Sequence, residues 1–380
     1  MFSYEFLQSY WWLLNSVLGA LLVFLLFVQG GQSLTLSAPS QDGRDVIVNA
    51  VGRKWEFTFT TLVTFGGAFY ASFPLFYSTS FSGAYFVWML ILITFVFQAV
   101  SYEFQNKAGN ILGKNAFRVF LTLNGCLGPL LIGTAVGTFF TGSSFIVNKD
   151  AAGSSLQPII SQWTGCCHGL EAVANPFNVE FGLMVMFLTM CLGALYLINN
   201  IDDEPLAKSL RGRLGFVFIC FLVCLVFVLV HLVTMPGYAV GEDGYVFIEK
   251  YRYLHNFLQM PAVLALFLAG AVLLVVGVVL TLFRKGFRRG IWFSAPGTVM
   301  VVMAIFMIAG YNNTAYYPSI ANLQSSLTLA NSCSSEFTLK AMSIVSLIIP
   351  FVLAYIVYAW RKMDLRSLTR KELAETDHKY

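Results

Sequence analysis

Long apolar stretches recur along the chain, separated by shorter segments that hold most of its charged residues. A helix needs about 20 mostly apolar residues to cross a hydrocarbon core of roughly 30 Å, and its backbone polar groups must be satisfied inside it. Nine stretches meet this requirement. They are residues 10–28, 56–78, 83–100, 116–141, 177–198, 212–234, 257–283, 291–311 and 342–360. The pattern predicts an all-α polytopic membrane protein with nine transmembrane helices.

The composition agrees with this class. Hydrophobic residues make up 57% of the 380 residues and charged residues only 11%, far more apolar than a water-soluble core requires. Nucleic-acid binding has no support. No Lys or Arg precedes Arg44, so the basic start of a cleavable signal peptide is missing and the first apolar stretch is expected to remain.

The basic residues predict the orientation. An odd number of spans puts the two termini on opposite sides, and basic residues concentrate in cytoplasmic loops. With the N-terminus outside and the C-terminus cytoplasmic, 19 of the 23 lysines and arginines fall inside, and Lys149, Lys250, Arg252 and Lys340 remain outside.

We expect one transmembrane domain over residues 1–363, with helices 1–4 at 10–141, helices 5–8 at 177–311 and helix 9 at 342–360. A cytoplasmic tail, 364–380, follows. The outer connections, 142–176, 235–256 and 312–340, are rich in Gly, Asn, Ser and aromatic residues, so we expect ordered caps or partner contacts rather than a separate domain.

Two carboxylates are candidates for chemistry at the predicted inner membrane face. Glu56 opens the second span after Arg53 and Lys54, and Glu103 closes the third. Charged groups near a membrane interior often mark a pathway, so the pair could relay protons. Equally, Glu56 could be a helix-start acid that favours the macrodipole, and Glu103 could pair with Lys107 one turn later.

Histidines and cysteines give weaker signals. His231 and His255 lie near helix ends, where interfacial hydrogen bonding is commoner than haem ligation. Cys166, Cys167 and His168 adjoin in a loop, but they lack Cys-x-x-Cys spacing and a second histidine pair, so no metal site is predicted. A disulfide from this loop to Cys333 is an open alternative.

Small residues and prolines carry packing signals. Gly133 and Gly137 form a G-x-x-x-G step, which lets helix backbones approach closely. Prolines within or beside the predicted spans are expected to kink or break the helices. They are Pro74, Pro129, Pro261, Pro296 and Pro350.

Several motifs, in order along the chain, resemble subunit II of cytochrome bd quinol oxidase. The opening Y-E-x-L-x-x-x-W-W-L begins at Tyr4, W-E begins at Trp55, and G-G-A-F and F-P follow in the same span. F-S-G-A-Y begins at Phe81, and S-S-L-T begins at Ser325 in the region before the ninth helix. The resemblance covers nearly the whole chain.

That resemblance implies two four-helix bundles plus a peripheral helix, in the plasma membrane of a bacterium. It implies a partner, subunit I, which binds haem b and haem d and oxidises quinol, while this chain binds no haem. The implied roles are to stabilise subunit I, to carry one cytoplasmic route for protons, and in some members to hold a structural quinone, near Trp55 here. A small single-helix subunit can also join.

In the family, acids associated with the proton route stand where this chain has Glu56 and Glu103. Gln29, in V-Q-G-G-Q-S-L, stands where many members have an Asp-Gly-x-Asp motif, and Gln98 replaces a family arginine. Two alternatives stay open: a purely structural scaffold subunit and a secondary transporter. The transporter would need a central polar site and repeats, which the sequence does not display.

Overall fold

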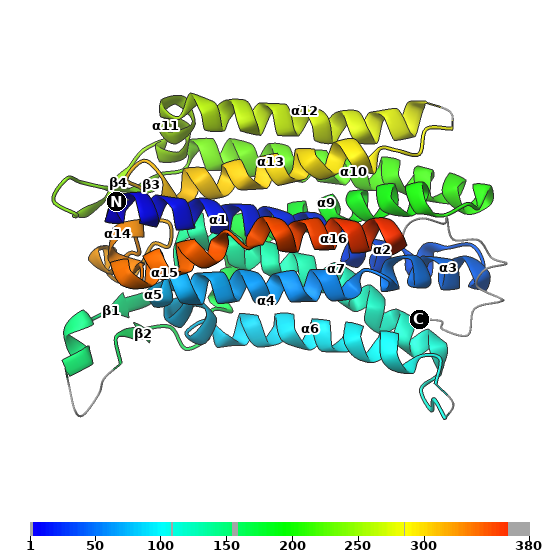
Figure 1. The fold of residues 1–380 in the computed structure, drawn as a ribbon, viewed down its shortest axis with the longest axis horizontal. Coiled ribbons are helices and arrows are strands. Elements are labelled where there is room, and N and C mark those ends of the chain that lie inside the picture. The colour runs from blue at the N-terminus through cyan, green and yellow to red at the C-terminus, as the bar shows by residue number, and fades with distance from the viewer. Residues whose placement is uncertain (1–2, 108, 154–158, 285, 364–380) are drawn as a thin grey trace.

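The long helices run side by side along one axis of the molecule (Figure 1). The computed structural model describes residues 3–107, 109–153, 159–284 and 286–363. Its longer helices are α1 Tyr4–Leu25, α2 Phe27–Ser33, α3 Gln41–Gly52, α4 Trp55–Ser72, α6 Tyr85–Phe104, α7 Gly113–Thr141, α9 Pro176–Asn200, α10 Glu204–Thr234, α11 Arg252–Gln259, α12 Pro261–Phe283, α13 Ile291–Gly310, α15 Glu336–Ser346 and α16 Ile349–Met363.

Short elements connect the long helices. They are η1 Thr35–Ser37, α5 Pro74–Phe76, η2 Tyr77–Ser82, β1 Phe145–Val147, η3 Lys149–Gly153, β2 Ser161–Trp163, α8 Glu171–Ala174, β3 Gly237–Val240, β4 Val246–Glu249, η4 Leu323–Ser325 and α14 Leu329–Ser332. Within the described ranges, eight helical segments are long and apolar enough to cross a membrane, and a ninth is added if the bent segment after α4 is counted with it. The prediction of a helical, multi-span protein is therefore confirmed. The tail 364–380 lies outside the described residues.

The first span is longer than residues 10–28. A break at Leu26 separates α1 from α2, yet α1, α2 and η1 together form one 34-residue apolar segment. The sequence Gln29-Gly30-Gly31-Gln32 looks like a polar end, but all four residues are buried inside α2. Another helix, α3, follows on the predicted inner side, where the sequence analysis expected no helix.

The second predicted span, 56–78, is not one straight helix. Helix α4 ends at Ser72, and the chain turns by 119° at Phe73 and Pro74 before the π-helical turn η2. A proline lacks the backbone N–H that would continue the helix. The last predicted span, 342–360, is likewise divided between α15 and α16, whereas Pro129 and Pro296 lie inside the uninterrupted helices α7 and α13.

The centre of the bundle is formed by α1, α7, α9 and α13. Helix α9 packs against α2, α7 and α10, and α13 packs against α1 and α12, so the two halves of the chain meet along α7–α9 and α1–α13. In the most apolar 18-residue stretch of α9, 72% of the residues are buried, whereas in the corresponding stretch of α12 only 22% are buried. The two-bundle arrangement and the orientation in the membrane remain predictions.

In this centre, Gly133 and Gly137 allow close helix packing, as the G-x-x-x-G step predicts. A Cβ atom on Gly133 would lie 2.8 Å from Cα of Gly182, and one on Gly137 would lie 2.8 Å from Oδ1 of Asn178. Both contacts are to α9, so the two glycines permit the close approach of α7 and α9.

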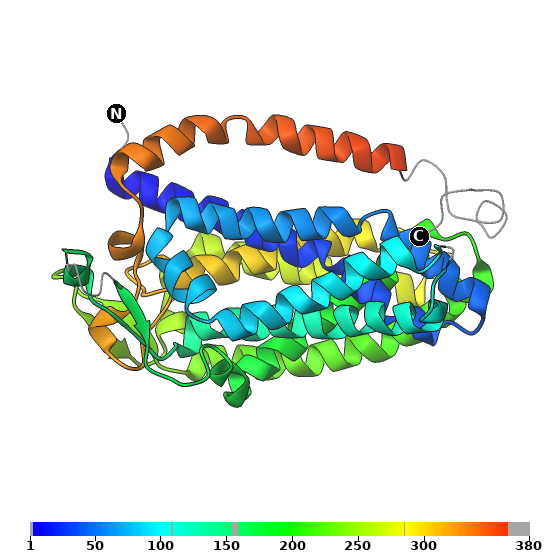
Figure 2. The same ribbon diagram turned by 90° about the horizontal axis from the view of Figure 1, so that it is seen from below.

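Helices α15 and α16 run along the outside of the bundle, beyond α1 and α4 (Figure 2). In their most apolar 18-residue stretch, only 6% of the residues are buried. The indole of Trp360 anchors the far end of α16 by packing against Phe24, Phe27 and Phe57. In a membrane protein such an exposed apolar helix faces lipid or another chain.

The three connections predicted outside fold over one end of the bundle. Strands β1 and β2 form one antiparallel hairpin and β3 and β4 another. Isolated bridges join Ser143 to Ser319 and Ala239 to Thr314, tying the connections to one another. The segment 154–158 lies outside the described residues.

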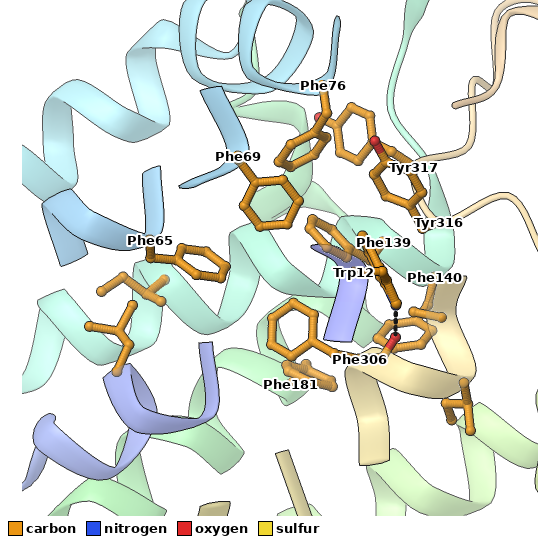
Figure 3. Packing of buried hydrophobic residues seen from close by; sticks show 14 of the residues in the cluster. Trp12, Phe65, Phe69, Phe76, Phe139, Phe140, Phe181, Phe306, Tyr316 and Tyr317 are labelled. Carbon is orange, nitrogen blue, oxygen red and sulfur yellow. Dashed lines mark hydrogen bonds between the residues drawn. The ribbon is translucent and has the colours of Figure 1, made fainter. Parts of the chain in front are cut away.

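An aromatic cluster fills the core beneath these connections (Figure 3). Trp12 is fully buried at its centre, with Nε1 donating a 3.0 Å hydrogen bond to the Phe306 carbonyl. Phe69, Phe73 and Tyr316 surround the indole at ring distances of 4.6 to 6.1 Å. Burying aromatic side chains contributes most of the packing energy such a core provides.

Candidate functional site

The two predicted carboxylates lie at the same end of the bundle, where α4 begins and α6 ends (Figure 1). Both are exposed. Glu103 forms an ion pair with Lys107 one turn later, as the structural alternative proposed. Glu56 occupies the first turn of α4, and no described residue forms an ion pair with it. Neither carboxylate lies inside the bundle.

Aromatic residues connect this end to the interior. Trp55, the first residue of α4, stacks on Tyr102 of α6, with ring centroids 5.9 Å apart and an interplanar angle of 20°. The preceding Lys54 is fully buried, and its Nζ lies 4.6 Å from the centre of the Trp360 ring. A cation placed over an indole in this way gains electrostatic stabilisation.

A chain of buried uncharged polar side chains continues inward from Tyr102. Gln32 of α2 donates to the Tyr102 hydroxyl at 2.9 Å, and Gln29, one turn earlier in α2, donates to Gln98 at 3.3 Å. Further along, Asn124 of α7 contacts the Thr94 hydroxyl at 3.4 Å. These side chains form a polar track between α2, α6 and α7.

Helical spacing explains why the three hydrogen-bonded pairs follow one another along α6. Thr94, Gln98 and Tyr102 are four residues apart, so they share one face of α6, and Gln105 follows three residues later as the C-cap of the helix. That face is buried, while Glu103 lies on the exposed face of the same helix. The sequence analysis singled out Gln29 and Gln98 but missed Gln32, Tyr102 and Asn124, which the spacing of polar residues within apolar stretches could have indicated.

Several atoms of the track have no hydrogen-bond partner among the described residues. They are the acceptors Gln29 Oε1, Gln32 Oε1 and Asn124 Oδ1 and the donors Gln98 Nε2 and Gln105 Nε2. Buried polar atoms are rarely left without partners, and ordered water commonly satisfies them. Donors and acceptors of this kind, close together, are suited to hold water.

At the end of the bundle predicted to be cytoplasmic, Arg118 of α7 is buried and fixes the position of α3. Its guanidinium pairs with the Asp45 carboxylate and donates to the Gln41 side chain, both on α3. A buried charge with a partner is far less costly than one without. Arg118 therefore links α3 to the bundle.

The two histidines considered as haem ligands lie elsewhere, at the opposite end. Nδ1 of His231 lies 3.9 Å from Glu180, and Nδ1 of His255 lies 2.7 Å from Glu249. Their side chains are 51% and 43% exposed. A haem in a helical bundle needs an axial ligand facing a buried cavity, so the surroundings of these two residues do not fit one.

The cysteine loop adopts a tight turn. Sγ atoms of Cys166 and Cys167 lie 3.2 Å apart as free thiols, while the His168 ring packs on Tyr85. Cys333 is also a free thiol, in contact with Tyr4 and Gln8, so the alternative disulfide to Cys333 is absent from the described structure. No group of three His, Cys, Asp or Glu side chains in the described part of the chain is arranged to share a metal ion.

Comparison with known proteins identifies the family. The model of the cytochrome bd terminal oxidase subunit II family matches residues 7–363. The chain belongs to this family. The family prediction from the ordered motifs is thus confirmed, and with it a multi-pass protein of the bacterial inner membrane.

Relatives of this subunit II match over almost their whole length. It is 25% identical to the cytochrome bd-I ubiquinol oxidase subunit 2 of Escherichia coli, covering 100% of this chain and 99% of the relative. It is 26% identical to a probable cytochrome oxidase subunit 2 of Haemophilus influenzae, covering 96% of each chain. Both relatives are named as the second subunit of a cytochrome oxidase.

Among solved structures, the fold resembles a chain of the bd oxidase from Geobacillus thermodenitrificans. The TM-score is 0.64 with 14% sequence identity, covering 94% of this chain and 98% of the other. At this identity the likeness concerns the fold.

Proposed function

We propose that this chain is the haem-free subunit II of a quinol oxidase that reduces oxygen to water. Haem b and haem d would lie in a partner subunit I, which this chain stabilises. The observation that carries the proposal is the character of the interior. Among the described residues, the buried polar side chains are amides, hydroxyls and the cations Lys54, Arg118 and Arg252, and none of them is a histidine. His231 and His255, the two histidines considered as haem ligands, are exposed beside glutamates.

The finer proposal concerns protons. Reduction of oxygen to water consumes protons, which must reach a site inside the membrane. Glu56 and Glu103 lie at the predicted cytoplasmic end, where exposed carboxylates can collect protons from solution, and Tyr102 begins the polar track beside them. We infer that water held by Gln29, Gln32 and Gln98 would carry protons onward, because amides orient water without trapping the proton.

The arrangement also supports a place for a structural quinone. The stacked rings of Trp55 and Tyr102 are the kind of flat aromatic surface against which a quinone ring packs. Trp55 would contribute to its environment and the chain would take no part in the redox step of the quinone. Quinol itself, a small single-helix subunit and membrane lipid remain proposed partners.

The alternative of a purely structural scaffold subunit differs from this proposal only in the role of Glu56 and Glu103, which would carry no protons. The ion pair between Glu103 and Lys107 favours it, since a carboxylate held by a lysine at a surface needs no function in proton transfer. Both versions share the haem-bearing partner.

Purification of the tagged complex tests the proposal. We expect a haem-bearing partner to co-purify with a d-type absorption band, and the variants His231→Gln and His255→Gln to retain the full haem-to-protein ratio. A loss of one haem per complex in either variant would show that this chain ligates haem. Deleting the chain should abolish stable haem d in the partner, and a fully active isolated partner would contradict the stabilising role.

A further inference from the structure

A groove opens at the predicted cytoplasmic end of the bundle, between the end of α2 with η1 and the helices α9 and α10. Its volume is about 510 Å³. Its lining includes the polar residues Ser33, Ser37, Ser209 and Arg213 and the apolar residues Met190 and Phe216. It is separate from the polar track, and the proposed oxidase function does not use it.

The groove has an uncompensated positive charge. Arg213 donates through Nη2 to the Ser37 carbonyl at 2.8 Å, and no described acid lies within ion-pair distance of its guanidinium. Other arginines at this end differ: Arg211 pairs with Glu204, and Arg288 pairs with Asp202 and Glu204. A guanidinium with free N–H groups is well matched to a phosphate oxygen.

The polar groups of α10 form one face. Along α10, Ser209 is followed after three, four and seven residues by Gly212, Arg213 and Phe216. These positions therefore lie on one face of the helix. Gly212 adds no side chain, and a Cβ atom placed on it would meet nothing within 4 Å. The glycine therefore leaves the groove open beside the guanidinium.

The depth of the groove in the membrane follows from the sequence of α10. Directly after Arg213 the helix becomes almost wholly apolar, and the Phe216 and Ile219 side chains are 69% and 63% exposed. Such exposed apolar side chains face acyl chains. Arg213 thus lies where the helix passes from the headgroup region into the hydrocarbon, with the apolar part of the groove on the hydrocarbon side.

We propose that this groove binds one anionic phospholipid of the cytoplasmic leaflet. The phosphate of the headgroup would contact Arg213 and Ser209, and an acyl chain would lie along Met190 and Phe216. A free phosphate would use only the polar part of the groove, and a quinone would leave the arginine without a counter-charge. The pairing of an arginine with an anionic headgroup at this depth follows the general attraction of basic residues to that leaflet.

The test uses the purified oxidase complex, stripped of lipid and placed in nanodiscs of phosphatidylcholine with increasing phosphatidylglycerol. Native mass spectrometry counts the bound phosphatidylglycerol. We expect saturable binding of one lipid at this site, weakened about fivefold in Arg213→Gln. Lys208→Gln is the matched control, because Lys208 is an exposed cation on the same helix outside the groove.

A second variant separates lipid binding from a folding defect. Gly212→Leu keeps every charge and fills the groove, so it should also weaken binding while the oxidase retains its haem spectrum. Equal losses in Arg213→Gln and Lys208→Gln would show nonspecific charge attraction and overturn the proposal. Competition by inorganic phosphate, or undiminished binding in Gly212→Leu, would overturn it as well.

Discussion

The side-chain amide of Gln29 in α2 donates a hydrogen bond of 3.3 Å to the amide of Gln98 in α6, and both side chains are fully buried. They are two of the positions at which the chain departs from the resemblance to subunit II, where an aspartate and an arginine are expected. The two departures are therefore in direct contact. A neutral amide pair occupies the place where the family pattern implies opposite charges.

Introducing only one of the two charges, aspartate at position 29 or arginine at position 98, should destabilise the complex. Introducing both charges together should be tolerated better. An uncompensated charge inside a protein costs about 3–5 kcal/mol, whereas a paired one costs far less. We expect Gln98→Arg and Gln29→Asp each to lower the yield and thermal stability of the complex, and the double variant to recover a substantial part. Thermal unfolding of the purified complex measures this as a double-mutant cycle.

The matched control is the apolar pair Gln29→Leu with Gln98→Leu. Replacing both hydrogen-bonding partners by apolar groups of similar shape changes the stability little. Replacing only one of them leaves the other as a buried polar group without a hydrogen bond. If the losses of Gln98→Arg and Gln29→Asp simply add in the charged double variant, the two side chains do not interact as the structure indicates.

How far the sequence could predict this region depends on the type of signal. The apolar stretches predicted most spans, because hydrocarbon requires long apolar helices. They failed at Gln29-Gly30-Gly31-Gln32, which looks like the end of a helix. The structure buries α2 instead, because Gly30 of α2 and Gly193 of α9 let the two backbones touch, and the glutamines find partners in α6.

The candidate site was predicted in part for a related reason. The order of charges and motifs indicated Glu56, Glu103 and Trp55 as residues at one membrane face. That Trp55 stacks on Tyr102, and that Glu103 faces away from the polar track, depends on how α4 and α6 are rotated about their axes. Sequence spacing gives the face of each helix but not the neighbour that the face meets.

Glu56→Gln should slow oxygen reduction by the complex without changing its haem content. A positioned proton carrier contributes about 10²-fold or more to a proton-limited step, so a loss approaching that size is expected if Glu56 is the main entry. Oxygen consumption with an excess of quinol measures the rate, and the reduced spectrum measures haem.

Glu204→Gln is the control for this experiment, since Glu204 is an exposed carboxylate at the same end of the molecule, on α10. It should turn over at the unmodified rate. Unmodified turnover in Glu56→Gln would instead favour the scaffold version of the function.

Gly30→Ala should disrupt the contact of α2 with α9. A Cβ atom on Gly30 would lie 1.8 Å from the Thr189 carbonyl oxygen, a backbone atom that cannot move aside alone. We expect a loss of about 1–3 kcal/mol in stability, as for other overpacked interiors. Gly67→Ala is the matched control, because a Cβ atom there meets nothing within 4 Å. Equal thermal stabilities of the two variants would mean that α2 and α9 are not in close contact.

The cap formed by the three connections predicted outside should weaken in acid because of Glu249. The carboxylate is partly desolvated, which alone would raise its pKa, but hydrogen bonds from His255 at 2.7 Å and Arg252 at 2.6 Å outweigh this and hold the pKa below its usual value of 4.5. A carboxyl with a lowered pKa in the folded state stabilises the fold above its unfolded pKa, and that contribution is lost as the pH falls through the folded value. The cap should therefore lose stability as the pH falls below about 4.5.

Thermal unfolding of the complex between pH 3 and pH 7 measures this effect. Glu249→Gln should be less stable than the unmodified protein at pH 7 and should lose less on acidification, because the carboxylate that titrates is gone. Glu242→Gln, an exposed acid in the turn of the same hairpin, should keep the original pH profile. An unchanged profile in Glu249→Gln would show that the contacts of Arg252 with the Asn312 and Asn313 carbonyls hold the cap without the ion pair.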